Sequence, residues 1–344
     1  MTTQLSLRMK RSVKLFGLLM VALMVISNDL KSCDICGCYI GVLPYDNQSS
    51  FSFMHRYRIF SGYETISGQF FPPGAYRYAA SPSPLHGGMT TTTKSVKDFE
   101  SYKNYELRGK WFIHPRVELN FYLPYVEVRS SEGDLNYKSH GLGDASVLAG
   151  FHLIKPNADK EFRHRLVAGF GAKLPTGKCD VMLSDGQRQD ILLQHGTGST
   201  DLIMFAGYSG GGKNFRWGNT FTTKFNGANK YGEQLATSFT NTASFGYIFT
   251  SHGWNIFPAI SAYQEYCKGV WIQHGLRNGT KMDCLLAGPQ LKIYHRNFSI
   301  DLEAGFNVYD RTDADNLLNK GRISCALGWS FNQNKFILNK TKKN

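Results

Sequence analysis

Hydrophobic and polar residues alternate one by one along most of the chain after residue 50. In the segment 117–125 the odd positions are all apolar or aromatic, and Glu118, Asn120 and Tyr122 stand between them. The segments 300–308 and 323–331 repeat this alternation. A period of two is typical of a β-strand with one apolar and one polar face, whereas a helix would repeat every three to four residues.

This pattern predicts twelve strands, most of them near the ~9–11 residues that a tilted membrane-spanning strand needs. They cover residues 51–60, 101–113, 117–128, 143–154, 163–175, 200–209, 214–225, 237–249, 254–266, 284–293, 298–309 and 321–331. Long and short connections alternate between them without exception. We therefore predict an all-β fold over residues 51–331, an antiparallel up-and-down transmembrane β-barrel of about 12 strands with long outer loops and short periplasmic turns.

Aromatic residues crowd the predicted strand ends, as they do in the interfacial girdles of membrane barrels. One set is Trp111, Phe112, Tyr247, Phe249, Trp254, Trp329 and Phe331, and the other is Phe60, Tyr102, Tyr125, Tyr263 and Tyr309. The last strand ends on Phe331, an arrangement that outer-membrane assembly machinery reads. The lipid bilayer and that machinery are the partners we expect.

The N-terminal residues 1–32 have the organisation of an export signal. A basic stretch precedes the apolar run 15–26, which is shorter than the ~20 residues that a spanning helix needs. A Cys-containing periplasmic segment, 33–50, would follow the signal, and a basic tail, 332–344, would end the chain. The order Leu-Lys-Ser-Cys before and at Cys33 is a loose lipobox, so lipidation of Cys33 is one way in which the signal could be processed.

The formal net charge of +13 changes little in this picture, because eight of these charges fall in the first 32 and the last 13 residues. The remaining positive charges are dispersed, whereas a nucleic-acid protein needs a concentrated basic face. We therefore exclude nucleic acid as a partner. The 47 Phe, Tyr and Trp residues exclude a disordered chain.

Three short motifs stand in order at predicted strand ends: Gly-Leu-Gly-Asp at 141–144, Lys-Leu-Pro-Thr-Gly at 173–177 and Gly-Thr-Gly-Ser at 196–199. Together they resemble a family of outer-membrane transporters labelled after the meta-pathway of phenol degradation. The segment 33–44 is also similar to exported barrels of Bacteroidetes-type bacteria. The resemblance implies a barrel in a Gram-negative outer membrane, passage of small and often hydrophobic molecules, and no enzyme chemistry.

Cys33, Cys36 and Cys38 form a C-x2-C-x-C cluster directly before the barrel. Closely spaced thiolates suit Cu(I) or Zn(II), although a fourth protein ligand is not evident. The alternatives are lipidation of one cysteine and a disulfide between two of them. Cys267 and Cys284 bracket another predicted outer loop at the facing ends of adjacent strands, which makes them candidates for a disulfide.

Ionisable residues recur in the phase opposite to the apolar one. They are Arg56, Arg58, Glu106, Arg108, Lys110, Glu118, Lys173, Lys292, Asp301 and Glu303. One interpretation is a polar pore whose charges screen permeants. The other is a set of cross-strand ion pairs that brace the inner wall.

Catalytic templates fit the chain poorly. His195 and Ser199 imitate a rim pair of a barrel enzyme but lack a third partner, so we predict no enzyme and no catalytic residue. The sequence favours a channel or transporter for small, possibly hydrophobic solutes. The alternatives are a structural or surface-binding closed barrel and envelope Cu or Zn handling through the Cys cluster. The aromatic-rich loop 61–100 is a candidate constriction or plug, and the alternative for it is an exposed, flexible loop.

Overall fold

The structure is a computed structural model, and it describes nine stretches of the chain. These are residues 48–62, 98–132, 135–156, 160–183, 186–212, 214–272, 275–276, 281–311 and 317–331. The predicted signal peptide, nearly all of the Cys-containing segment, most of the loop 61–100 and the basic tail lie outside the described residues.

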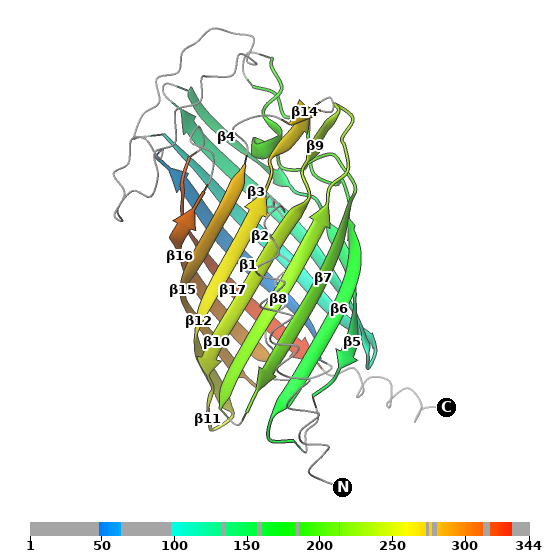
Figure 1. Cartoon of the computed structure of the whole chain (residues 1–344), viewed down its shortest axis with the longest axis vertical. Coiled ribbons are helices and arrows are strands. Elements are labelled where there is room, and N and C mark those ends of the chain that lie inside the picture. Colours follow the sequence, from blue (N-terminus) through cyan, green and yellow to red (C-terminus); the bar gives the residue numbers. More distant parts are fainter. Residues whose placement is uncertain are drawn as a thin grey trace. The chain divides into compact units, whose positions relative to one another are not determined.

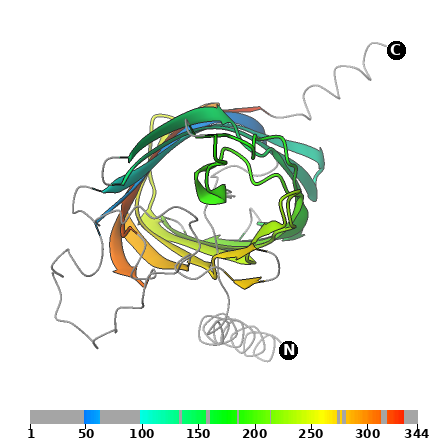
Figure 2. The same cartoon turned by 90° about the horizontal axis from the view of Figure 1, so that it is seen from above.

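Among the described residues, twelve antiparallel strands close into a barrel (Figures 1 and 2). In chain order they are β1 (Ser49–Ser61), β2 (Phe99–His114), β3 (Val117–Glu132), β5 (Ser146–Ile154), β6 (Arg163–Lys173), β7 (Asp201–Gly211), β8 (Phe215–Phe225), β10 (Ser238–Tyr247), β12 (Trp254–Cys267), β15 (Met282–His295), β16 (Phe298–Asp310) and β17 (Asn319–Phe331). Each one overlaps one predicted strand. The predicted fold class is confirmed.

The first and last strands complete the ring. β1 pairs with β17 in an unbroken antiparallel register from Ser49 opposite Phe331 to Ile59 opposite Gly321. A closed sheet leaves no strand edge without a partner, so every strand finds hydrogen bonds on both sides.

The outer face of the barrel is apolar and the inner face is polar. Large hydrophobic side chains lie exposed in the outward phase, with Leu107 58% and Ile260 69% accessible. Charged side chains occupy the inward phase, where Glu118 and Lys173 are buried. This is the inverse of a water-soluble barrel, and the strict period of two along each strand is what produces it.

The aromatic girdles are present in part. Trp111, Phe249, Trp254 and Trp329 are exposed at strand ends, as expected. In contrast, Phe60, Phe112 and Tyr263 are buried. These three positions belong to the inward phase of their strands, so position near a strand end was not sufficient to place them on the outer face.

Short and long connections collect at opposite ends of the barrel (Figure 1). One end carries tight turns such as 115–116 and 296–297. We call the other the long-loop end. Here β3 continues to Glu132 and pairs with β4 (Leu135–Leu142), so a hairpin replaces most of the predicted loop 129–142.

The predicted strand 143–154 begins later than expected. Residues 143–145 separate β4 from β5, and Asp144 turns its side chain towards Lys173 instead of continuing the ladder. The predicted loops 226–236 and 267–283 also contain structure. β9 (Glu233–Leu235), β13 (Val270–Ile272) and β14 (Gly275–Leu276) form a separate three-stranded sheet.

Two further elements are short. β11 (Phe249–Ser251) pairs with β12 at the tight-turn end, and the 3-10 helix η1 (Ile191–Leu193) lies at the long-loop end. No helix within the described stretches is long and apolar enough to cross a membrane.

Closure of the barrel can be tested with a native cysteine. His55 on β1 faces Cys325 on β17, and directly opposed residues hold their Cβ atoms about 4.5–5.5 Å apart. We expect His55→Cys to cross-link to Cys325 through a short thiol-reactive linker. The cross-link joins the two ends of the barrel sequence, so the denatured chain should migrate differently on a gel.

Phe51→Cys is the matched control, because Phe51 lies on the same outward face but is opposite Trp329, four residues along β17 from Cys325. Equal cross-linking of the two variants would contradict the β1–β17 pairing.

Candidate functional site

The ten ionisable residues singled out in the sequence lie in the interior phase of the barrel wall. Seven are buried, namely Arg56, Arg58, Glu106, Glu118, Lys173, Lys292 and Glu303. Arg108, Lys110 and Asp301 are partly buried. Charges held out of water require partners, so their pairing decides what the interior can do.

Most of these side chains pair with residues on the same or an adjacent strand. Lys292 lies 3.1 Å from Asp301, and Arg322 lies 3.3 Å from Glu303. The Glu118 carboxylate lies 3.5 Å from the Lys110 ammonium and 3.0 Å from His152 Nε2. Arg108 pairs with Glu106 on the same strand. The interior is therefore a network of opposite charges that braces neighbouring strands, as one of the two interpretations requires.

One ion pair reaches across the barrel. The Arg58 guanidinium on β1 donates to Glu265 on β12 at 2.7 Å, although β17, β16 and β15 lie between these strands in the sheet. Glu265 is fully buried. This bridge narrows the interior near the long-loop end. Sequence reasoning missed Glu265, although its inward phase on the segment 254–266 could have identified it.

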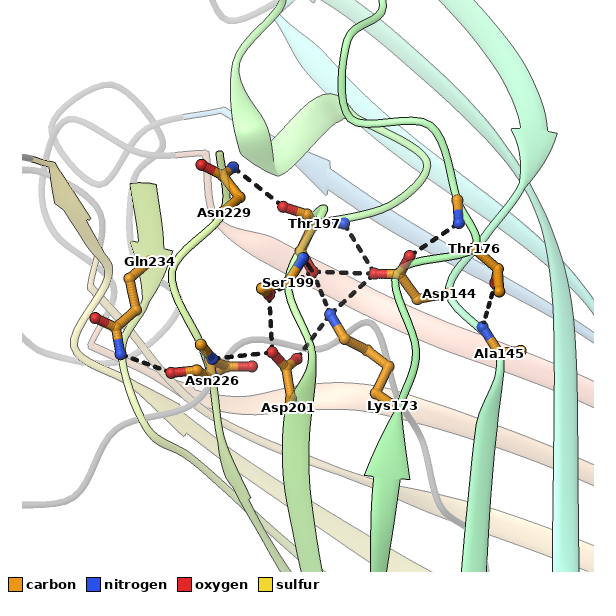
Figure 3. Close-up of polar contacts among 12 residues, drawn as sticks. Asp144, Ala145, Lys173, Thr176, Thr197, Ser199, Asp201, Asn226, Asn229 and Gln234 are labelled. Atoms are coloured by element: carbon orange, nitrogen blue, oxygen red, sulfur yellow. Dashed lines mark hydrogen bonds and ion pairs between the residues drawn. The ribbon is translucent and has the colours of Figure 1, made fainter. Parts of the chain in front are cut away.

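A second buried cluster joins the three sequence motifs (Figure 3). Lys173, the last residue of β6, places its Nζ 2.9 Å from Asp144 Oδ2 and 2.7 Å from Asp201 Oδ2. Asp144 comes from the break between β4 and β5, and Asp201 begins β7. All three side chains are essentially inaccessible to solvent. The attraction between the ammonium and the two carboxylates offsets the desolvation free energy that burial costs all three groups.

Thr197 and Ser199 complete this cluster, which we call the polar latch (Asp144, Lys173, Thr197, Ser199 and Asp201). The Thr197 backbone N–H donates to Asp144 at 2.8 Å, and its hydroxyl donates to the same oxygen at 3.0 Å. The Ser199 hydroxyl donates to Asp201 at 2.8 Å. The latch therefore fixes a backbone segment of the loop, the break between β4 and β5, and the paired ends of β6 and β7.

The glycines of the motifs permit this close approach. A Cβ at Gly196 would lie 2.5 Å from the Asp144 carboxylate and 2.7 Å from the Gly177 backbone. The Gly177 N–H in turn donates to Asp144 Oδ1 at 3.0 Å. A side chain at either position would separate the two halves of the loop between β6 and β7.

The described residues of that loop, 174–183 and 186–200, are called the mouth loop. Seen from above, it lies within the ring of strands (Figure 2). At its far side Ile191 joins an apolar cluster with Leu235, Cys267 and Val270, and Cys267 belongs to β12. The mouth loop is thus held to one wall by the polar latch and to another part of the barrel by apolar packing. It crosses the long-loop end between them.

The structure separates His195 and Ser199. The His195 ring contacts the Ser139 hydroxyl at 2.5 Å, whereas Ser199 bonds to Asp201. Burial lowers the pKa of His195, and the nearby His140 and Lys178 lower it further. The buried imidazole packs against Gly141 and contacts Ser139, both on β4, so it attaches the mouth loop to this strand.

The interior near the tight-turn end contains a cavity of about 140 Å³. Its lining includes Arg108, Lys110, Asn120, Tyr122, Lys292 and Tyr294. A second cavity of about 30 Å³ lies beside His152 and Arg165. An engineered cavity of about 150 Å³ in another protein holds benzene, so the larger one has room for a molecule of that size.

The predicted disulfide between Cys267 and Cys284 is wrong, because both are buried free thiols in this structure. The register pairs Cys267 with Met282 and Cys284 with Glu265. The two cysteines are therefore diagonal neighbours with Cβ atoms roughly 7 Å apart, beyond the ~4.5 Å limit of a disulfide.

Cys33, Cys36 and Cys38 lie outside the described residues, so their lipidation and metal binding stay predictions. Within the described stretches, no three His, Cys, Asp or Glu side chains gather closely enough to hold a metal ion.

The barrel is similar to a solved outer-membrane channel from Pseudomonas putida F1, with a TM-score of 0.59 and 13% identity over 86% of this chain and 99% of that one. Looser likenesses include the β domain of the Bordetella autotransporter BrkA, with a TM-score of 0.41 and 10% identity over 83% of this chain and 100% of that one. Another is the CymD monoaromatic hydrocarbon channel, with a TM-score of 0.31 and 8% identity over 83% and 88% of the two chains.

Neither the family models nor the curated proteins compared with this sequence give a match. At 13% identity, the likeness to the Pseudomonas structure shows the fold alone, a closed antiparallel β-barrel, which has twelve strands in this chain.

The polar latch makes a prediction about stability. Lys173→Met keeps the length of the side chain but leaves two buried carboxylates without their cation, which should destabilise the barrel by about 3–5 kcal/mol. The free energy of unfolding in urea, measured in detergent micelles, checks this.

Lys230→Met is the control, because the Lys230–Asp180 pair spans 3.7 Å and both side chains are about half exposed or more. Its effect on the free energy of unfolding should be far smaller than that of Lys173→Met, because solvent screens an exposed ion pair. Equal losses for the two variants would show that the latch is not a buried electrostatic anchor.

Proposed function

We propose that this protein is an outer-membrane channel for small solutes whose outer mouth is narrowed by the mouth loop. The observation that carries the proposal is the closed ring with apolar side chains outside and charged side chains inside. Such a ring suits a lipid environment, because its outer surface would be costly to expose to water.

The orientation follows from the connections and the predicted signal peptide. Bacterial barrels place short turns in the periplasm and long loops outside the cell. The long-loop end would then face outwards, and the mouth loop would lie at the entry to the lumen. The cavity beside Lys110 and Lys292 would open towards the periplasm.

The choice of permeant rests on the lining. The family resemblance implies small and often hydrophobic molecules, and the meeting of its three motifs in the polar latch supports that resemblance. The cavity combines two tyrosine rings with Arg108, Lys110 and Lys292. This mixture favours a small molecule that carries both an aromatic and a polar group over a pure hydrocarbon.

A second candidate is a closed barrel that acts through its outer loops. The Arg58–Glu265 bridge and the paired charges of the inner wall favour it, because they brace the interior instead of leaving charges free for permeants. The two candidates differ in whether solute passes through a correctly folded barrel.

Ile191→Asp separates these candidates. A carboxylate in the apolar cluster should release the mouth loop on the β12 side while the polar latch keeps the barrel folded. We expect a several-fold higher conductance in planar bilayers than for the wild-type protein.

Met182→Asp is the matched control, since Met182 lies on the same loop but is 55% exposed, and its conductance should stay at the wild-type level. If folded wild-type protein and Ile191→Asp both fail to conduct, the channel is excluded and the closed barrel is favoured.

A further inference from the structure

Basic side chains gather on the outward face of β2, β3 and β4 at the long-loop end. The registers place Ser101, Arg129 and Lys138 in one row across these strands. The next row on the same face lies two residues further along each strand towards the tight-turn end, and it contains Lys103, Glu127 and His140. We call Lys103, Arg129 and Lys138 the basic patch.

The row directly below shows that this patch faces away from the lumen. Tyr105, Tyr125 and Leu142 form that row, and Tyr125 and Leu142 are 40% and 55% exposed. Residues two positions apart on a strand share a face. The patch therefore continues the lipid-facing columns of these strands beyond their aromatic end.

The patch has an excess of positive charge. Glu127 accepts from Arg129 at 2.7 Å and lies 3.7 Å from Lys103, while Lys138 is exposed on the neighbouring strand. One carboxylate among three cations leaves two positive charges. The Arg129 side chain is 45% exposed, so its guanidinium stays accessible to a ligand as well as to Glu127.

The height of the patch fits the lipid headgroups. Twelve residues separate Val117, at the tight-turn end of β3, from Arg129, which corresponds to about 40 Å along the strand. A strand tilt of roughly 40° reduces this to about 30 Å along the barrel axis, slightly more than the ~25 Å apolar band of such barrels. Arg129 and Lys138 then stand just outside the hydrocarbon layer.

We propose that the basic patch binds the phosphate groups of a phosphorylated glycolipid in the outer leaflet, of the lipid A type. Arg129 would engage a phosphate through its planar fork, and the two lysines would act as point charges. The exposed Tyr125 and Leu142 would contact the acyl chains of the same lipid. This inference rests on the proposed outer-membrane location but not on conduction.

The test uses the full-length protein in detergent, titrated with bisphosphorylated lipid A and followed by native mass spectrometry. Lys103→Gln/Arg129→Gln/Lys138→Gln should bind roughly tenfold or more weakly than wild type. The control, Arg116→Gln/Lys155→Gln/Lys160→Gln, removes the same charge near the tight-turn end and should bind like wild type.

Three results would overturn the proposal. They are equal affinity of the two triple variants, equal binding of dephosphorylated lipid A, and displacement of the lipid by an equal concentration of inorganic phosphate. Heat-modifiable migration on a gel verifies that each variant is a folded barrel. Cell fractionation and conductance of the patch variant, which should match wild type, report separately on location and channel function.

Discussion

The backbone ladder between β1 and β17 is the interaction on which the rest of the structure depends. An open sheet of this composition would present unpaired N–H and C=O groups together with an apolar face. Closure pairs the backbone groups and separates two environments, an outer surface of exposed side chains such as Leu107 and an interior where Lys173 and Glu118 are buried. The polar network, the mouth loop and the cavity all lie in the interior that this ladder creates.

Charge pairing is the second constraint, because the interior holds many ionised groups away from water. Most of these groups form ion pairs between neighbouring strands, as Lys292 on β15 and Asp301 on β16 do. The polar latch pairs charges from the break between β4 and β5 and from the ends of β6 and β7, and it thereby anchors the mouth loop (Figure 3). Stability of the wall and shape of the entrance therefore depend on the same buried groups.

The fold was largely predictable, because a period of two records at each position whether a side chain faces outwards or inwards. The inward phases of Arg58 and Glu265 were both accessible in this way, but their pairing was not, since contact across a lumen depends on the closed shape. The inward course of the mouth loop was missed for a related reason. It depends on Asp144 and Ile191, which lie on different parts of the chain and meet their partners through tertiary contacts. Spacing also suggested a Cys267–Cys284 disulfide that the strand register excludes.

The central claim is that solute passes through the lumen, and modification of a cysteine introduced at the cavity wall tests it most directly. Ser52 lines the cavity, whereas Phe53 is exposed on the outer face. Single-channel current should fall when a thiol-reactive cation modifies Ser52→Cys, and it should be unchanged for Phe53→Cys. Equal responses of the two variants, or no current from either folded protein, would contradict passage through this barrel.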